Sequence, residues 1–406
     1  MKKIRYPYTL VFLSIPACLA GSMGWFGVFT FVNGYIVKEL SCSNHDWTLA
    51  TLWFTCGIAL WQFVSAELAT KIGRRATISF GMIVTAIGYA LLPFATEFKT
   101  VAAILFFLGF AIASNGAAFF PLVVKIGGSR PGHALAVMNI VNALVGMLSL
   151  IFGGLLISSI SVQKAFFIFA LLFFACAILF FRLSSFFSDT DREPALGILR
   201  LKKKDFQGLF TLRFLTLILL GYALEPFNYH SINQLFPNIA RDFFGMGEGP
   251  IGILVGLGRI PAIAVLFFLS RKVDKMNVRL VYGTVLVAAG FCVSFLGLAP
   301  YRWLLLFWYY GFYLFHGAIW ATNSASVNAS VPSRLIDAAF VVMSTVGMGA
   351  VIFTGAVHAA MLNAGMTLPR LFFSCGLIAS AGGLLLIGVS LLFLRNTPGF
   401  YKVRER

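Results

Sequence analysis

The feature that most constrains this chain is a succession of apolar runs, each long enough to cross a membrane. Lipid offers the backbone no hydrogen-bond partners, so a spanning segment must be a helix or part of a closed barrel. One helical crossing needs about 20 apolar residues. Hydrophobic residues make up 59% of the chain and charged residues 11%, an imbalance that no soluble core requires. We predict twelve transmembrane helices, at about 8–36, 47–70, 76–95, 100–123, 134–160, 165–182, 209–238, 249–270, 280–299, 303–329, 336–362 and 369–394.

A repeat divides these segments into two sets of six. Polar residues of one set return 204 positions later in the other: Lys71, Arg75, Ser129, Arg130, Ala134 and Val137 recur as Lys275, Arg279, Ser333, Arg334, Ala338 and Val341. A match at a fixed offset indicates two copies of one unit. Because each copy has an even number of crossings, both enter the bilayer the same way round. We predict an all-α membrane protein of two pseudo-symmetric six-helix bundles, 1–183 and 209–406, joined by a linker at 184–208, with a site between them.

The distribution of basic residues predicts the orientation. Of the 31 Lys and Arg, 23 fall on the side of the two termini and six on the other side. This positive-inside bias predicts cytoplasmic termini and a cytoplasmic linker, and we expect the inner membrane of a bacterium. The net charge of +17 therefore reflects topology and the lipid bilayer, and no nucleic-acid partner is needed to account for it.

The sequence shows no sign of an enzyme. Its six cysteines have no metal-ligand or disulfide spacing, and no nucleophile–base arrangement is recognisable. The short loops leave no room for a catalytic domain outside the membrane. We expect no metal, no cofactor and no enzymatic activity.

Three ionisable residues lie near the middle of predicted spans: Glu225, Arg259 and His316. Such residues are costly in a bilayer and are candidates for function. In one interpretation, Arg259 binds an anionic substrate while Glu225 and His316 carry protons. In the other, a Glu225–Arg259 ion pair fixes the packing of the helices and His316 is hydrogen-bonded nearby. The other candidates for substrate binding or coupling are His230, Trp320, Asn323, Asn115, Asn139, Asn142, Gln62 and Trp25.

Pro226 follows Glu225 and removes a backbone donor from the seventh segment. The carbonyl near Tyr222 then loses its partner, which predicts a kink or an unwound turn. The polar run after it, 228–234, is unsuited to lipid. We expect this stretch to line a cavity.

The loop after the second segment, Ala66-Glu67-Leu68-Ala69-Thr70-Lys71-Ile72-Gly73-Arg74-Arg75, resembles the signature of the major facilitator superfamily, G-x-L-x-D-R-x-G-R-R. The second copy, 270–279, keeps the acidic residue Asp274 and the basic residues Lys275 and Arg279. The resemblance implies the major facilitator fold and transport by alternating access. It also implies a gate at the cytoplasmic side, formed by Glu67, Lys71, Arg74, Arg75, Arg130, Asp274, Lys275, Arg279 and Arg334. Thr70 stands where the family has Asp, and Glu67 is the candidate to replace that charge.

Trp25, Phe26, Gly27 and the mid-span Arg259 are similar to features of monocarboxylate and oxalate/formate transporters. We predict a monomeric secondary transporter that moves a small organic anion by symport with protons. Two alternatives stay open. One is an exporter of amphipathic or cationic compounds, which the 44 phenylalanines would suit. The other is a sensor or assembly factor that has a transporter fold but does not transport.

Overall fold

The computed structural model describes residues 8–127, 131–184, 208–269, 272–273, 276–332 and 335–393. Within these ranges every regular element is a helix. The helices of the first half are α1 (Tyr8–Ser22), η1 (Met23–Val32), η2 (Tyr35–Glu39), α2 (Asn44–Lys71), α3 (Arg74–Leu91), η3 (Leu92–Phe94), α4 (Phe98–Ser114), η4 (Asn115–Phe119), α5 (Phe120–Gly127), α6 (Pro131–Ser159) and α7 (Val162–Ser184).

The second half repeats this arrangement. Its helices are α9 (Leu212–Thr216), η7 (Leu217–Tyr222), α10 (Pro226–Asp242), α11 (Glu248–Leu257), α12 (Arg259–Leu269), α13 (Val278–Gly297), α14 (Arg302–Ser330), α15 (Ile336–Asn363) and α16 (Leu368–Phe393). Elements η1, η2, η4 and η7 are π-helical, and each continues an α-helix within one crossing. The all-helical fold has twelve membrane helices, as predicted.

Eleven of these helices in the described ranges are long and apolar enough to cross a membrane. The seventh is the exception, because it is interrupted. Its π-helical part ends at Tyr222, a turn covers 223–225, and α10 begins at Pro226. The predicted break is therefore confirmed. Pro226 occupies the first turn of α10, where a missing amide hydrogen costs nothing.

The ends of several helices follow from local chemistry. The Ser43 side chain accepts a hydrogen bond from the amide of Asp46, and the Asp46 carboxylate accepts one from the amide of Ser43. This capping box starts α2 at Asn44, three residues before the predicted 47. At the other end, Gly73 has φ of 89°, a conformation that glycine adopts without strain, and it turns the chain into α3.

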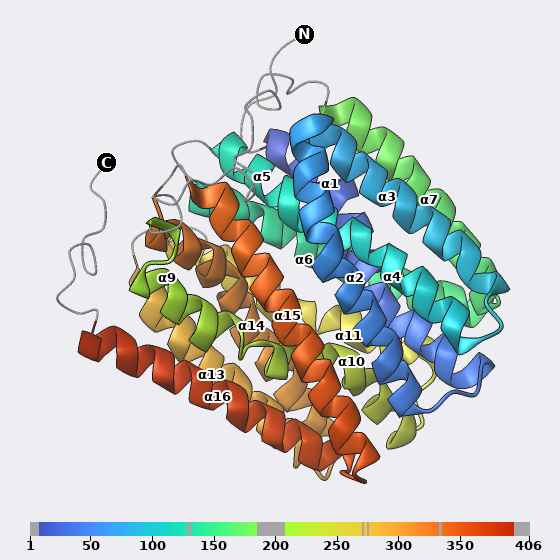
Figure 1. Cartoon of the computed structure of the whole chain (residues 1–406). Helices are drawn as coiled ribbons and strands as arrows, with labels where there is room; N and C mark the ends of the chain where they lie inside the picture. Colours follow the sequence, from blue (N-terminus) through green and yellow to red (C-terminus); the bar gives the residue numbers. More distant parts are fainter. Residues whose placement is uncertain are drawn as a thin grey trace.

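The two halves lie side by side (Figure 1), and their most extensive contacts involve α2 and α6 of the first half. Helix α2 packs on α15, and α6 packs on α11 and α12. Helix α1 begins and α16 ends at the same side of the bundle, which we call the terminal side. The opposite side, where η2 ends at Glu39 and α11 begins at Glu248, is called the distal side.

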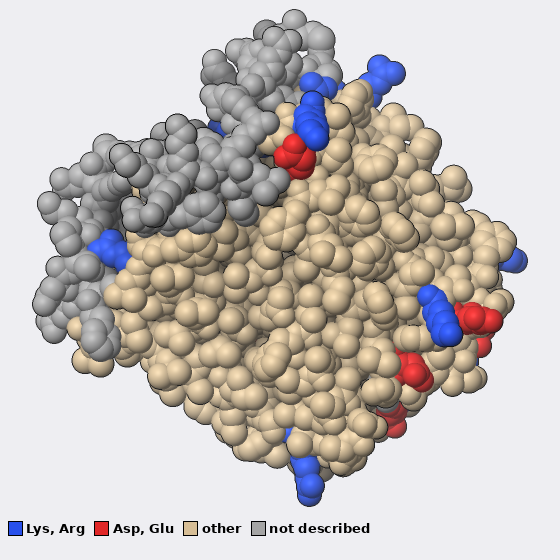
Figure 2. Space-filling view, viewed as in Figure 1, with Lys and Arg blue, Asp and Glu red and all other residues tan. Residues whose placement is uncertain are grey.

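The surface is that of a membrane protein. Figure 2 shows charged side chains at the edges of a broad uncharged surface. Large apolar side chains are exposed on several helices of the protein, including Phe152 at 65%, Leu171 at 72% and Phe268 at 72%. Lipid covers such a surface without the cost that water would impose.

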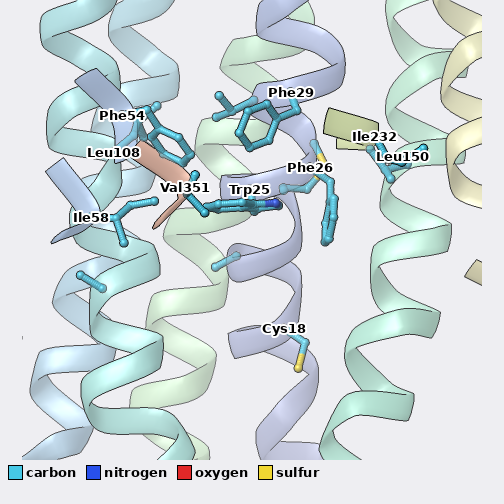
Figure 3. Close-up of a cluster of buried hydrophobic side chains, with 14 of the residues drawn as sticks. Cys18, Trp25, Phe26, Phe29, Phe54, Ile58, Leu108, Leu150, Ile232 and Val351 are labelled. Atoms are coloured by element: carbon cyan, nitrogen blue, oxygen red, sulfur yellow. The ribbon is translucent and has the colours of Figure 1, made fainter. Parts of the chain in front are cut away.

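Close packing inside the first half depends on two glycines. A Cβ on Gly109 of α4 would lie 2.6 Å from the backbone nitrogen of Ile58 in α2, and a Cβ on Gly57 would meet the carbonyl oxygen of Phe106. Small residues allow membrane helices to approach this closely. Beside this contact, Trp25, Phe29 and Phe54 form an aromatic cluster in the buried core (Figure 3).

Candidate functional site

Arg259 stands at an interruption of the eighth membrane helix. Helix α11 ends at Leu257, and α12 begins at Arg259. Pro261 has no amide hydrogen, so it cannot bond back to the carbonyl of Leu257. The interruption lies inside the protein, and Arg259 is fully buried, with 0% of its surface exposed.

The guanidinium group of Arg259 has no hydrogen-bond acceptor among the described residues. Its Nε, Nη1 and Nη2 are all buried and unpaired. Instead, Cζ lies 3.5 Å from the centroid of the Phe26 ring, and the rings of Tyr313 and Trp320 are each 6.0 Å away. An aromatic face attracts a cation but leaves its N–H donors unsatisfied. Because arginine cannot shed its charge, the arrangement is that of a cation without its anion.

This charge lies at the interface between the two halves. Arg259 comes from the second half, whereas Phe26 belongs to η1 of the first half. On α6, a Cβ added to Gly146 would lie 3.4 Å from Nε and Nη1 of Arg259 and 3.1 Å from Oγ of Ser22. Gly146 therefore leaves the space that the guanidinium group fills. A position between two such halves is where transporters of this architecture bind substrate.

Glu225 and His316 are two further ionisable residues at the site, and they lie next to each other. Glu225 lies in the turn before α10, and its Oε1 is 3.6 Å from Nδ1 of His316. This distance fits an ion pair when His316 is protonated, but it is too long for a hydrogen bond. No ion pair joins Glu225 to Arg259 in the described part of the chain, so the packing interpretation, in which this pair fixes the helices, is not what the structure shows.

Four rings lie nearly parallel across the interface. His316 stacks on Phe312 with centroids 5.1 Å apart and on Tyr229 with centroids 4.5 Å apart. Tyr229 in turn stacks on Trp25 of the first half at 6.1 Å. The indole nitrogen of Trp25 is buried and has no hydrogen-bond partner. The stack thus places another unpaired donor in line with His316, the partner of Glu225.

The other predicted residues divide into two groups. Near the centre, Asn139 donates to the carbonyl of Trp320 at 3.3 Å, and Asn142 accepts from the hydroxyl of Ser22 at 2.8 Å. The Oδ1 atom of Asn323 is buried and unpaired.

Three predicted residues lie elsewhere. Gln62 donates to Ser344 of α15 at 2.7 Å, a contact between the halves. Asn115 packs beside Gly21 in the first helix. His230 follows Tyr229 in α10 and stacks on His358, with ring centroids 5.8 Å apart.

Sequence reasoning named Phe26 and Trp320 but missed three other rings of the site. Tyr229, Phe312 and Tyr313 are aromatic residues in a chain that has many, so their identity alone carries no signal. One pattern was available: Tyr309, Tyr313, His316 and Trp320 recur at helical spacing on one face of the tenth segment. That face contains the histidine and points to the site.

The predicted gate residues are only partly described. Glu67 forms an exposed ion pair with Lys71 at 3.3 Å. Arg75 donates to the hydroxyl of Ser184 at 3.0 Å, and the guanidinium of Arg279 donates to the carbonyl of Arg213 and to Thr216. Four further gate residues, Arg130, Asp274, Lys275 and Arg334, lie outside the described residues. The proposed latch between Glu67, Arg74, Arg75 and Arg130 concerns an outward-open state and stays a prediction.

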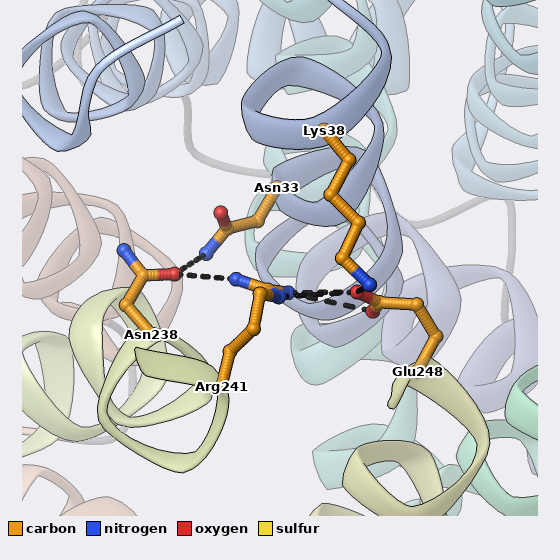
Figure 4. A network of polar contacts seen from close by, with 5 residues as sticks. All are labelled: Asn33, Lys38, Asn238, Arg241 and Glu248. Atoms are coloured by element: carbon orange, nitrogen blue, oxygen red, sulfur yellow. Dashed lines mark hydrogen bonds and ion pairs between the residues drawn. The ribbon is translucent and has the colours of Figure 1, made fainter. Parts of the chain in front are cut away.

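The distal side is closed by a polar network that crosses between the halves (Figure 4). Glu248 of α11 accepts from Lys38 at 3.1 Å and from Arg241 at 3.1 Å. Asn238 accepts from Arg241 and from Asn33 of the first half, both at 2.9 Å. Asn33 and Lys38 belong to the first half, and the other three residues belong to the second. The structure is therefore sealed at its distal side.

Comparison with known proteins settles the family. The model of the Major Facilitator Superfamily matches residues 15–356. The chain belongs to the major facilitator superfamily. Among solved structures, this major facilitator is similar to a mutant of the nucleoside transporter NupG, with a TM-score of 0.66 and 13% identity over 94% of this chain and 99% of that chain. At that identity the likeness shows the fold alone. No curated protein matches this major facilitator by sequence.

Proposed function

We propose that this major facilitator is a proton-coupled transporter of small organic anions. The observation that carries the proposal is the guanidinium group of Arg259, which is fully buried between the halves with all its nitrogens unpaired. A buried charge of this kind is strongly destabilising unless an opposite charge meets it. A carboxylate can accept two parallel hydrogen bonds from a guanidinium group, which makes it the natural partner.

The neighbours of Arg259 fit such a substrate. The indole nitrogen of Trp25 and the Nε2 atom of His316 are buried and unpaired, and each can donate to a carboxylate or hydroxyl oxygen. The rings of Phe26, Tyr313 and Trp320 enclose the guanidinium group and offer apolar surface to the rest of the substrate. Small size and negative charge are therefore the two properties we expect of the substrate.

Coupling to protons is assigned to Glu225 and His316. Their separation of 3.6 Å is close enough that a small approach forms a hydrogen bond, along which one proton can pass between the carboxylate and the imidazole. An anion bound to Arg259 changes the electrostatic potential at both groups and so changes which of them is protonated. Alternating access would follow from rocking of 1–183 against 209–406 around this site, with 184–208 as the linker.

A binding experiment tests the anion site. We expect oxalate, lactate, succinate or benzoate to raise the melting temperature of the purified protein by mass action. Arg259→Ala should abolish this rise, because losing a charge-assisted hydrogen-bonded pair weakens binding by about tenfold or more. Arg302→Ala, at the exposed start of α14, is the matched control and should keep the response. If Arg259→Ala binds the anion as well as the original protein does, the anion site is wrong.

A transport experiment tests the coupling. In proteoliposomes with an imposed pH gradient, the original protein should accumulate the bound anion. Glu225→Gln should still bind the anion and exchange it, but it should not accumulate it against a concentration gradient. Full gradient-driven accumulation by Glu225→Gln would exclude this residue from coupling.

The aromatic side chains of the site favour one alternative substrate class. Trp25, Phe26 and Tyr229 would also suit an amphipathic compound. Arg259 opposes a cationic one, because like charges would be buried together. An amphipathic substrate would be indicated if hydrophobic amines or neutral drugs, and no carboxylate, stabilise the protein.

A further inference from the structure

A cluster of buried polar side chains on the distal half of the protein takes no part in the proposed anion site. His358 of α15 lies at its centre and is 0% exposed. Its Nδ1 is 2.8 Å from Oε1 of Gln234, and its Nε2 is 3.0 Å from Oγ of Ser231 and 3.4 Å from Sγ of Cys375. Every side-chain nitrogen of His358 thus has a partner.

The hydrogens of this cluster can be assigned from the donors. The Thr51 hydroxyl donates to the carbonyl of Thr48, so its oxygen accepts from the Gln234 amide nitrogen at 2.6 Å. That orients Oε1 of Gln234, which can only accept, towards His358. Nδ1 of His358 therefore carries a hydrogen in either protonation state.

The other ring nitrogen of His358, Nε2, has a hydrogen-bond partner in both the neutral and the protonated form of the ring. The Ser231 hydroxyl donates to the carbonyl of Phe227, which leaves its oxygen free to accept. In the neutral ring, Nε2 accepts from the thiol of Cys375. In the charged ring, Nε2 donates to the oxygen of Ser231. The same side chains therefore satisfy His358 with and without the second proton.

This cluster is also part of the contact between the two halves. The side-chain amide of Gln234 in α10 donates to the hydroxyl of Thr51 in α2. The backbone carbonyl of Gln234 accepts from the indole of Trp47, also in α2, at 3.1 Å. Trp47 and Thr51 belong to the first half, so His358 is linked to α2 of the first half through a single side chain, Gln234. Opening of the distal side must separate Gln234 from both α2 residues.

We propose that His358 is a second proton-binding site and that its protonation opens the distal side. The titratable groups that face it are His230 of α10, stacked at 5.8 Å, and Cys375 of α16. Among the described residues of α2, the uncharged Thr51 is linked to it through Gln234. No carboxylate among the described residues is paired with it. A charged ring is therefore hydrogen-bonded but has no counter-ion while it is buried, and it gains solvation when the distal side opens. Protons accordingly favour the distal-open state, whereas the neutral ring favours the sealed one.

The test measures the opening without substrate, so it does not depend on the anion site. Spin labels carried by ketone-bearing amino acids at Glu39 and Asp242, both exposed at the distal side, leave the native cysteines in place. The distance between labels should shift towards longer values between pH 8 and pH 5.5. His358→Gln, whose amide can still donate to Gln234, should abolish the shift and remain sealed.

Two matched variants separate this effect from other titrations. His230→Gln and His45→Gln should keep the pH-dependent shift, because neither residue is hydrogen-bonded to the Gln234 bridge. A shift retained in His358→Gln would assign the titration to another group and would overturn the proposal. So would an unchanged distance in the original protein at both pH values, a result that needs no variant to fold.

Discussion

At the scale of single residues, the centre of this protein is organised by a charge that no described residue pairs with. Arg259 is held by the face of Phe26 at 3.5 Å and by no hydrogen bond. The sequence predicted Arg259, Glu225 and His316 as a group, because ionisable residues are rare at mid-membrane. It did not predict their pairing, since the depth of a residue along its helix does not tell which way its side chain points.

Phe26→Leu should lower the melting temperature of the ligand-free protein. The guanidinium group would lose the ring nearest to it among the described residues, a contact worth about 1–2 kcal/mol when it is desolvated. Thermal unfolding of the detergent-solubilised protein measures this effect. Phe29→Leu is the matched control: it removes a similar ring that contacts Trp47 and Phe54 but not Arg259. Equal decreases in melting temperature in the two variants would show that lost packing accounts for the effect and that the cation–ring attraction contributes nothing.

At the scale of elements, hydrophobic runs predicted the helices well and their interruptions unevenly. The break before Pro226 was predictable, because proline removes a specific hydrogen bond. The π-helical stretches in η1, η4 and η7 were not, since no residue type marks them in the sequence. The capping box of Ser43 and Asp46 was present in the sequence and would have placed the start of α2 correctly.

The contact between α2 and α4 yields a prediction at this scale. Gly57→Ala should destabilise the protein by about 1–3 kcal/mol or more, because the added methyl group overlaps the backbone of Phe106 and the helices must separate. The melting temperature reports the loss. Gly349→Ala on α15 is the control, because nothing lies within 4 Å of its Cβ position. Unchanged stability of Gly57→Ala would mean that α2 and α4 are not in contact there.

At the scale of the whole molecule, the repeat and the even number of crossings predicted two halves with a site between them. What the sequence could not indicate is which side is sealed, because that depends on small differences in free energy between conformations. In this structure, the network of Asn33, Lys38, Asn238, Arg241 and Glu248 closes the distal side.

Glu248→Gln should shift the protein towards the distal-open state. The neutral side chain keeps its shape but loses its attraction to Lys38 and Arg241, a weakening of about 1–3 kcal/mol. Distances between labels at Glu39 and Asp242 measure the shift. Gly34→Ala should act in the same direction by a different cause, because its methyl group would lie 2.8 Å from the Glu248 carboxylate. A sealed population that stays constant in both variants would show that this network does not hold the distal side.

The orientation in the membrane is a separate prediction. Reporter domains fused at Arg406 and near Asp191 should both report a cytoplasmic location, because basic residues concentrate on the side of the termini. An external location for either fusion would rule out the predicted orientation.

The π-helical stretches have a consequence for how the site could be rearranged. A π turn contains an extra residue, and when it moves one residue along a helix, the residues it passes rotate by about 100° around the helix axis. Element η1 carries Trp25 and Phe26, and η7 leads into Glu225. Movement of the π turn can therefore change the direction of a side chain by rotating part of the helix, without breaking the helix. We expect a distal-open structure to show η1 with its π turn at different residues; a distal-open structure with η1 unchanged would exclude this movement.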